Sequence, residues 1–239
     1  METLLFIINH VGIISFAAAG AMIAIDHETD LFGVVLLALI TCFGGGMTRD
    51  VIAGQAIDRE IPAFFTDMSL EIIFCVVTAI TVFVLAALFK RQYVEKEAFV
   101  DKINNVLDAL GIGVFAAAGV GAYIEVGPLV AITMGLLSSI GGSIVRDIML
   151  RTVPFVLRKR IYAVAVLAGS SVYYLIVKVF MPNAESAGAV ATVSCIIVIF
   201  TIRMCATAFK LNMPKAIRFS ELRAEEESPE KSETLEIKK

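Results

Sequence analysis

The sequence has no tryptophan, few charged residues and only four cysteines. Charged residues make up 18% of its 239 positions, whereas hydrophobic residues make up 58% and the mean hydropathy is +0.85. A soluble domain of this composition would expose large apolar patches and aggregate. The composition therefore excludes an ordinary soluble protein and indicates an integral membrane protein. Without tryptophan, anchoring at the membrane surface falls to Tyr, Phe and basic residues.

The sequence also lacks the patterns of reactive residues that mark enzymes and metal proteins. Each of the four cysteines lies in an apolar stretch, and none belongs to a CxxC or Cys/His cluster. There is no Ser-His-Asp set, no pair of catalytic carboxylates, no HExxH and no P-loop. We therefore expect no enzyme, no bound metal, no resident cofactor and no nucleic-acid partner.

Seven apolar stretches are each long enough to cross a bilayer as a helix, which takes about 20 residues. Alternation over about ten residues, which is typical of a membrane β-barrel, is absent. The first stretch lacks the positive leader of a signal peptide, so we expect it to be retained. The sequence thus predicts an all-α integral membrane protein with seven transmembrane helices. They cover residues 3–25, 31–56, 69–89, 104–124, 127–150, 160–181 and 187–208.

Basic residues predict the orientation of these spans. Lys and Arg concentrate in residues 90–102, in residues 151–160 and after residue 209, whereas the loops of opposite parity hold little beyond Arg59. Because cytoplasmic loops carry the excess of Lys and Arg, the C-terminus is expected in the cytoplasm and the N-terminus outside the plasma (inner) membrane. Residues 209–239 are too polar to bury a core, so we expect a disordered cytoplasmic tail.

Two motifs occur twice along the chain. Residues 12–20 (GIISFAAAG) recur as residues 111–119 (GIGVFAAAG), and residues 44–50 (GGGMTRD) recur as residues 141–147 (GGSIVRD). The first pair starts 99 positions apart, and each copy holds three spans. An odd number of spans inverts the second copy, so we predict an inverted 3+3 repeat, with units at 1–90 and 104–181, plus a seventh helix at 187–208.

The first motif places small residues and one phenylalanine on a single helix face. Gly12, Phe16 and Gly20 are spaced by four, and the second copy repeats this spacing with Phe115 at its centre. Small residues at this spacing let two helix backbones approach closely. Two interpretations remain open: simple packing, or a narrow aqueous path that Phe16 and Phe115 constrict and gate by dewetting.

The second motif predicts a glycine break in spans two and five. Each glycine weakens a helix by about 1 kcal/mol relative to alanine, and a broken helix in lipid needs water or protein for its unpaired backbone groups. We therefore expect these positions to face a cavity, with a glycine-rich crossing between closely packed helices as the alternative. The positions concerned are Gly44, Gly45, Gly46, Gly141, Gly142 and Ser143.

An arginine and an aspartate follow each glycine group. Intramembrane charges are costly and usually functional. The inversion puts Arg49–Asp50 and Arg146–Asp147 on opposite sides of the midplane, which argues against a direct bridge from Arg49 to Asp147. Because neighbouring residues on a helix point about 100° apart, each charge is expected to find a separate partner on another helix. The pairs serve either structure or gating. Arg203, near a span end, is expected to extend toward the surface.

These motifs and the three-plus-three-plus-one layout resemble the prokaryotic members of the trimeric intracellular cation (TRIC) channel family, over residues 3–208. The resemblance implies a homotrimer in which each protomer has its own pore for potassium and other monovalent cations. It places the pore among spans one, two, four and five, with kinks at the glycines of spans two and five. Ser143 departs from the triple glycine of the first copy. No Lys-rich motif matches the lipid-binding positions of animal members.

The predicted function is therefore a potassium-permeable monovalent cation channel with one pore per protomer, lined by the glycine-kinked helices. Membrane lipids and permeant K⁺ or Na⁺ are its expected partners. No TVGYG-like filter occurs, so selectivity should be modest and set by half-helix carbonyls and by hydroxyls. The alternative is a secondary transporter of a small neutral solute such as glycine, and a third interpretation is an assembly protein without a path. The expected lining hydroxyls belong to Ser15, Thr41, Ser138 and Ser139.

Overall fold

The computed structural model describes residues 2–66, 69–158, 161–182 and 184–210. Within this part of the chain, seven helices are long and apolar enough to span a membrane, and no strand occurs. The predicted all-α membrane fold is confirmed, and the chain is a multi-pass membrane protein. The spans are α1 (Glu2–Asp26), α2 (Leu31–Ala53), α4 (Ser69–Leu88), α6 (Glu97–Ala122), α7 (Pro128–Met149), α9 (Ile161–Leu175) and α10 (Ala187–Ala208).

Short helical elements connect or extend the spans. The 3-10 turn η1 (Gly54–Ile57) prolongs α2, and the π-helical turn η2 (Ile176–Phe180) prolongs α9. α3 (Ala63–Thr66) and α8 (Phe155–Arg158) each follow an Arg-Asp motif, and α5 (Lys90–Glu95) lies between the two repeats. The placement of α3 and α8 after the same motif is the first structural sign of the repeat.

The span boundaries agree with the sequence prediction except at α6. This helix begins at Glu97, seven residues before the predicted start of its span. Residues 97–103 mix three charged side chains with four apolar ones. Glu, Ala and Lys favour helix, and the charged side chains can reach water beyond the hydrocarbon core. The hydropathy pattern therefore missed a helical extension that carries charges. The predicted disordered tail lies almost entirely outside the described residues.

Local signals explain where two helices begin. Asp30 caps α2, because its Oδ1 accepts a hydrogen bond from the backbone N–H of Gly33 at 2.8 Å. Pro128 begins α7, where its missing N–H costs nothing. Gly127 precedes it with φ 133°, a conformation that residues with a side chain rarely adopt.

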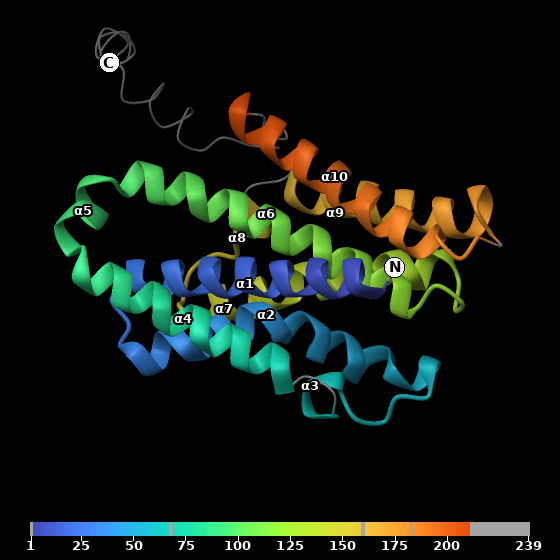
Figure 1. Cartoon of the computed structure of the whole chain (residues 1–239), viewed down its shortest axis with the longest axis horizontal. Helices are drawn as coiled ribbons and strands as arrows, with labels where there is room; N and C mark the ends of the chain where they lie inside the picture. The colour runs from blue at the N-terminus through green and yellow to red at the C-terminus, as the bar shows by residue number, and fades with distance from the viewer. Residues whose placement is uncertain (1, 67–68, 159–160, 183, 211–239) are drawn as a thin grey trace, which may run out of the picture.

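Four helices form the centre of the molecule, and three lie outside them. α1 contacts α2, α4 and α6, whereas α7 contacts α2, α6 and α9; Figure 1 shows α1 between α6 on one side and α2 with α4 on the other. α4 is the least buried span, at 11% of its most apolar window, whereas α1 reaches 56%. The outer helices therefore present their apolar side chains to lipid, and the doubled motifs lie on the central four.

Candidate transport site

The two glycine motifs meet where α2 crosses α7. We call this contact the glycine crossing and define it by Gly44, Gly45, Gly141 and Gly142. A Cβ atom on Gly44 would lie 3.1 Å from the Cα of Gly142, and one on Gly141 would lie 2.9 Å from the Cα of Gly45. Cβ atoms on Gly45 and Gly142 would overlap backbone carbonyl oxygens of the facing helix. Backbone therefore touches backbone, which only glycine allows.

The contacts at this crossing run in reverse order along the two helices. Thr41 meets Gly142, whereas Gly45, further along α2, meets Ser138 and Gly141. α2 and α7 are therefore antiparallel, as an inverted repeat requires. Equivalent contacts support the same symmetry, because Gly20 packs on Thr41 and Gly119 packs on Ser138.

The predicted glycine break is absent. α2 runs without interruption from Leu31 to Ala53, and α7 runs from Pro128 to Met149. Close packing supplies the reason: a continuous helix keeps its backbone hydrogen bonds in the membrane, while the glycines let the facing helix approach. Gly46 is the exception, since a Cβ there would meet only the Arg49 guanidinium, at 3.9 Å. This space explains why the second copy accommodates Ser143.

The two phenylalanines of the first motif stack against each other. The rings of Phe16 and Phe115 are 5.0 Å apart between centroids and 8° from parallel. Phe16 also lies against Gly111, and Val114 lies against Gly12, so the two copies interlock where α1 meets α6. Both rings are buried. The sequence suggested the same role for Phe16 and Phe115 but did not predict that they touch. The structure shows that they are in direct contact.

The first Arg-Asp motif forms an ion pair within itself. Nη2 of Arg49 lies 2.6 Å from Oδ1 of Asp50, and Nε donates to the same oxygen at 2.7 Å. Nη1 of Arg49 donates to Oγ of Ser138 at 3.1 Å, across to α7. The other oxygen of Asp50 accepts from the backbone N–H of Ala63, the first residue of α3, at 3.0 Å. Arg59 approaches that oxygen at 3.9 Å.

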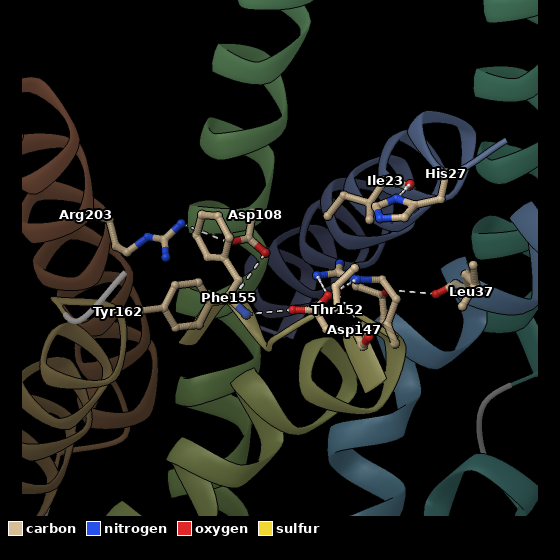
Figure 2. Close-up of polar contacts among 11 residues, drawn as sticks. Ile23, His27, Leu37, Asp108, Asp147, Thr152, Phe155, Tyr162 and Arg203 are labelled. Atoms are coloured by element: carbon tan, nitrogen blue, oxygen red, sulfur yellow. Dashed lines mark hydrogen bonds and ion pairs between the residues drawn. The ribbon is translucent and has the colours of Figure 1, made fainter. Parts of the chain in front are cut away.

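The second motif repeats this arrangement with a different loop. Nη2 and Nε of Arg146 donate to Oδ1 of Asp147 at 2.8 and 3.0 Å. The second carboxylate oxygen of Asp147 accepts from the backbone N–H of Phe155, the first residue of α8, at 2.7 Å (Figure 2). Thr152 donates its hydroxyl to the carbonyl oxygen of Asp147 at 3.1 Å. We call this shared arrangement, an Arg-Asp pair that also holds the start of a short helix, the Arg-Asp clamp.

The Arg-Asp clamps correct one expectation of the sequence analysis. Arginine and aspartate were expected to bind separate partners on other helices, but each arginine binds the next residue. The arginine side chain is long and flexible enough to fold back onto the carboxylate of the next residue despite the helix rotation. The clamps do lie at opposite ends of the crossing, since Arg49 contacts Ser138 and approaches the Tyr123 ring at 5.8 Å, whereas Arg146 lines a cavity with Asp108.

A further buried ion pair joins α6 to α10. Nη2 of Arg203 donates to Oδ2 of Asp108 at 2.9 Å, and the hydroxyl of Tyr162 donates to Oδ1 of that aspartate at 3.3 Å (Figure 2). The Arg203 guanidinium also lies 4.1 Å from the centre of the Tyr162 ring. Asp108 was not among the residues predicted for the site, and Arg203 was expected to reach the surface, yet Arg203 is buried. The sequence feature that could have identified Asp108 is its position, since it places a carboxylate inside an apolar span, three residues before Gly111.

A polar cavity of about 210 Å³ lies beside the second Arg-Asp clamp. Residues of α6, α7 and α9 line it, together with Ile23 of α1 and Phe155 of α8. The polar lining side chains are those of Asp101, Asn104, Asn105, Asp108, Arg146 and Tyr162. In the described ranges no group of three or more His, Cys, Asp or Glu side chains is placed to hold a metal ion.

The four expected lining hydroxyls are all buried, and two of them hydrogen-bond to carbonyl oxygens of their own helices. Thr41 donates to the carbonyl oxygen of Leu37 at 2.7 Å, and Ser139 donates to that of Gly135 at 2.9 Å. Ser138 differs, because it accepts from Arg49 across the crossing. Ser15 is buried on α1. The structure thus brings Ser138 into the site and leaves Thr41 and Ser139 bonded to their own helices.

Comparison with known proteins decides the family. A family model described as "Glycine transporter" matches residues 6–87 and 105–178, which correspond to the two repeats. A solved TRIC cation channel superimposes with a TM-score of 0.74 and 26% identity over 89% of this chain and 97% of that channel. The chain belongs to the bacterial TRIC family. The resemblance predicted from the paired motifs is confirmed.

Two more proteins extend the comparison of this TRIC family member. The TRIC trimeric intracellular cation channel orthologue from Rhodobacter sphaeroides has a TM-score of 0.71 and 27% identity, covering 87% of this chain and all of that one. The inner membrane protein YadS of Escherichia coli is 32% identical over 88% of this chain and 95% of its own length. The similarity therefore spans the whole described fold and not only the motifs.

Proposed function

We propose that this protein is a potassium-permeable channel for monovalent cations. The observation that carries the proposal is the fold shared with solved TRIC cation channels over nearly nine-tenths of the chain. The glycine crossing and the two Arg-Asp clamps lie on the helices at the centre of that fold. No enzymatic activity is proposed, since the structural relatives are channels.

The permeation path in this proposal runs among α1, α2, α6 and α7, once in each protomer. The Phe16–Phe115 stack is its hydrophobic constriction, because two buried parallel rings would exclude water until they separate. The glycine crossing lets α2 and α7 shift against each other, since no side chain lies between their backbones. The continuous helices remove half-helix carbonyls as selectivity elements and leave hydroxyls such as that of Ser138.

The proposal includes a homotrimer with its C-terminus in the cytoplasm. Trimeric assembly is supported by the description of the Rhodobacter sphaeroides orthologue as a trimeric channel, and orientation by the basic residues of α5 and of the loop after α7. α4 is the least buried span, so its exposed apolar side chains are open to lipid or to a neighbouring protomer.

Single-channel recording tests the proposal. Purified protein in a planar bilayer should give unitary potassium currents. In a gradient of potassium chloride, the reversal potential should lie near the equilibrium potential of potassium and not of chloride. Sodium should carry a comparable current. The Phe16→Ala/Phe115→Ala double variant should increase the open probability, because the constriction loses both rings. The absence of unitary current, or a current that prefers anions, would refute the channel.

The second candidate is a secondary transporter of a small neutral solute such as glycine. The description of the matching family model supports it, and an inverted repeat also suits alternating access. Proteoliposomes distinguish the two functions: saturable, ion-coupled uptake of labelled glycine without unitary currents would favour the transporter.

A further inference from the structure

A larger cavity, separate from the polar one beside the second Arg-Asp clamp, lies where α1 and α4 end and α5 begins (Figure 1). We call it the α4–α5 cavity. Its volume is about 700 Å³, which is typical of a ligand pocket. No residue of the glycine crossing or of the Arg-Asp clamps lines it. Its apolar walls come from Ile25 of α1, from Phe83, Ala86 and Ala87 of α4, and from Val94 of α5.

The α4–α5 cavity crosses the boundary between the hydrocarbon core and water. α1 ends at Asp26 and α4 ends at Leu88, each after enough apolar residues to cross the core. Phe83 lies within the apolar part of α4, whereas Lys90 and Tyr93 follow its end. Tyrosine is enriched at this boundary. A ligand that fills the cavity therefore needs an apolar part and a polar part.

Two charges of opposite sign line the polar part of the cavity. Glu28 follows α1, Lys90 begins α5, and both side chains are exposed. Neither belongs to an ion pair within the described part of the chain. Glu28 also has φ 56°, a conformation that favours glycine, so the backbone does not explain a glutamate there. Both charges are therefore available to a ligand.

We propose that the α4–α5 cavity binds a membrane phospholipid of the phosphatidylethanolamine class. An acyl chain lies against Phe83 and Ala86, Lys90 binds the phosphate, and Glu28 accepts hydrogen bonds from the primary ammonium group. Phosphatidylglycerol would leave Glu28 without a counter-charge, and phosphatidylcholine has no N–H to donate. The site concerns lipid binding alone, so it goes beyond the proposed function and holds for a channel and for a transporter.

Native mass spectrometry of the full-length protein tests the choice of headgroup. The protein in detergent is titrated with phosphatidylethanolamine, phosphatidylcholine and phosphatidylglycerol that carry identical acyl chains. Phosphatidylethanolamine should bind about two- to fivefold more tightly than either of the others, as expected for one exposed charge pair. Tightest binding of phosphatidylglycerol would reflect general attraction of anionic lipid to basic residues. Equal binding of all three would reflect the acyl chains alone. Either result would overturn the proposal.

Charge variants on neighbouring positions separate the cavity from the rest of the surface. Glu28→Gln should abolish the preference for phosphatidylethanolamine, and Lys90→Gln should weaken binding of all three lipids by about two- to fivefold. The matched controls are Arg91→Gln and Glu95→Gln, whose exposed ion pair on α5 does not line the cavity. They should leave the affinity for phosphatidylethanolamine unchanged. Equal effects of lining and control variants would contradict the site.

A filling variant tests the apolar part of the cavity. Ala86→Phe should weaken binding of all three lipids, because its ring occupies the space of the acyl chain. Thermal unfolding checks that the variant is folded, and if it is not, the exposed charge variants still decide the question. Unchanged lipid affinity together with a loss of oligomer would show that a neighbouring protomer fills the cavity, and the lipid proposal would be wrong.

Discussion

The two repeats share one architecture but differ in how they use charge. Both hold an arginine, the next aspartate and the start of a short helix in an Arg-Asp clamp. In the first repeat the arginine is 11% exposed and Arg59 adds a second cation. In the second the arginine is 2% exposed, and a polar cavity and the Asp108–Arg203 pair lie beside it. Duplication preserved the geometry, whereas the surrounding side chains diverged.

This difference shows what an inverted repeat constrains. The backbone crossing must fit both halves at once, so glycine occupies equivalent places in each. The second repeat also receives α10, which has no counterpart in the first and which brings Arg203 to Asp108. The structural asymmetry between the repeats therefore comes from residues outside the shared motifs.

Removing one carboxylate from each Arg-Asp clamp should have the largest effect. Asp147→Asn should destabilise the protein by about 3 kcal/mol, because a buried arginine loses its counter-charge. Asp50→Asn should cost less, since Arg49 is more exposed and keeps its bond to Ser138. Thermal unfolding in one detergent measures both. Equal losses in the two variants would show that the Arg-Asp clamps are energetically equivalent.

Breaking the Asp108–Arg203 ion pair, which is specific to the second repeat, should cause the next largest loss of stability. Arg203→Met should cost about 2–3 kcal/mol, because it leaves Asp108 buried without its cation. The matched control is Lys178→Met, which breaks a pair whose glutamate is 80% exposed and which should cost less than about 1 kcal/mol. The same unfolding measurement applies. A larger loss for the control would contradict the anchoring of α10 through Arg203.

The close packing at the glycine crossing can be tested by comparing a glycine-to-alanine substitution inside the crossing with one at Gly46, just outside it. Gly142→Ala should destabilise by about 1–2 kcal/mol, since its Cβ would overlap backbone of α2. Gly46→Ala should be neutral or should stabilise by up to about 1 kcal/mol, because only a flexible guanidinium lies near and alanine favours helix. Comparable destabilisation by both would mean that the glycines act through helix flexibility and not through close packing.

The smallest effect should come from the phenylalanine stack. Phe16→Leu and Phe115→Leu should each cost about 1 kcal/mol, and the double variant should cost less than the sum, because the stack is one shared interaction. A double-mutant cycle in unfolding measures this coupling. Strict additivity would show that the two rings are stabilised independently by their own repeats.

The sequence predicted the spans well because hydropathy over about 20 residues is a long, redundant signal. Six of the seven span starts agree with the structure within about two residues, and only α6 begins earlier, at polar Glu97. The sequence could not predict the glycine contacts, because glycine weakens an isolated helix and also permits a close crossing. Which effect prevails depends on whether a partner helix is present.

For the charged residues, too, part of the arrangement could be predicted from the sequence and part could not. Arg49, Asp50, Arg146 and Asp147 were recognised from the doubled motif, but their pairing within each motif was not, since side-chain reach depends on rotamers and on nearby loops. Asp108 was missed because its partner is 95 positions away. The cavity lining was missed for a related reason: Asn104 resembles an ordinary polar residue near a helix end until residues of α7 and α9 complete the cavity that it lines.

The sequence by itself determined the membrane class and the seven spans, because both follow from composition and hydropathy. The doubled motifs predicted the inverted repeat and carried the resemblance to the family. Only the tertiary structure decided that the glycines pack backbone against backbone, that each Arg-Asp motif pairs within itself, and that Arg203 is buried on Asp108. These are consequences of contacts between distant segments. Their free energies depend on burial and distance, and neither quantity exists until the helices are assembled.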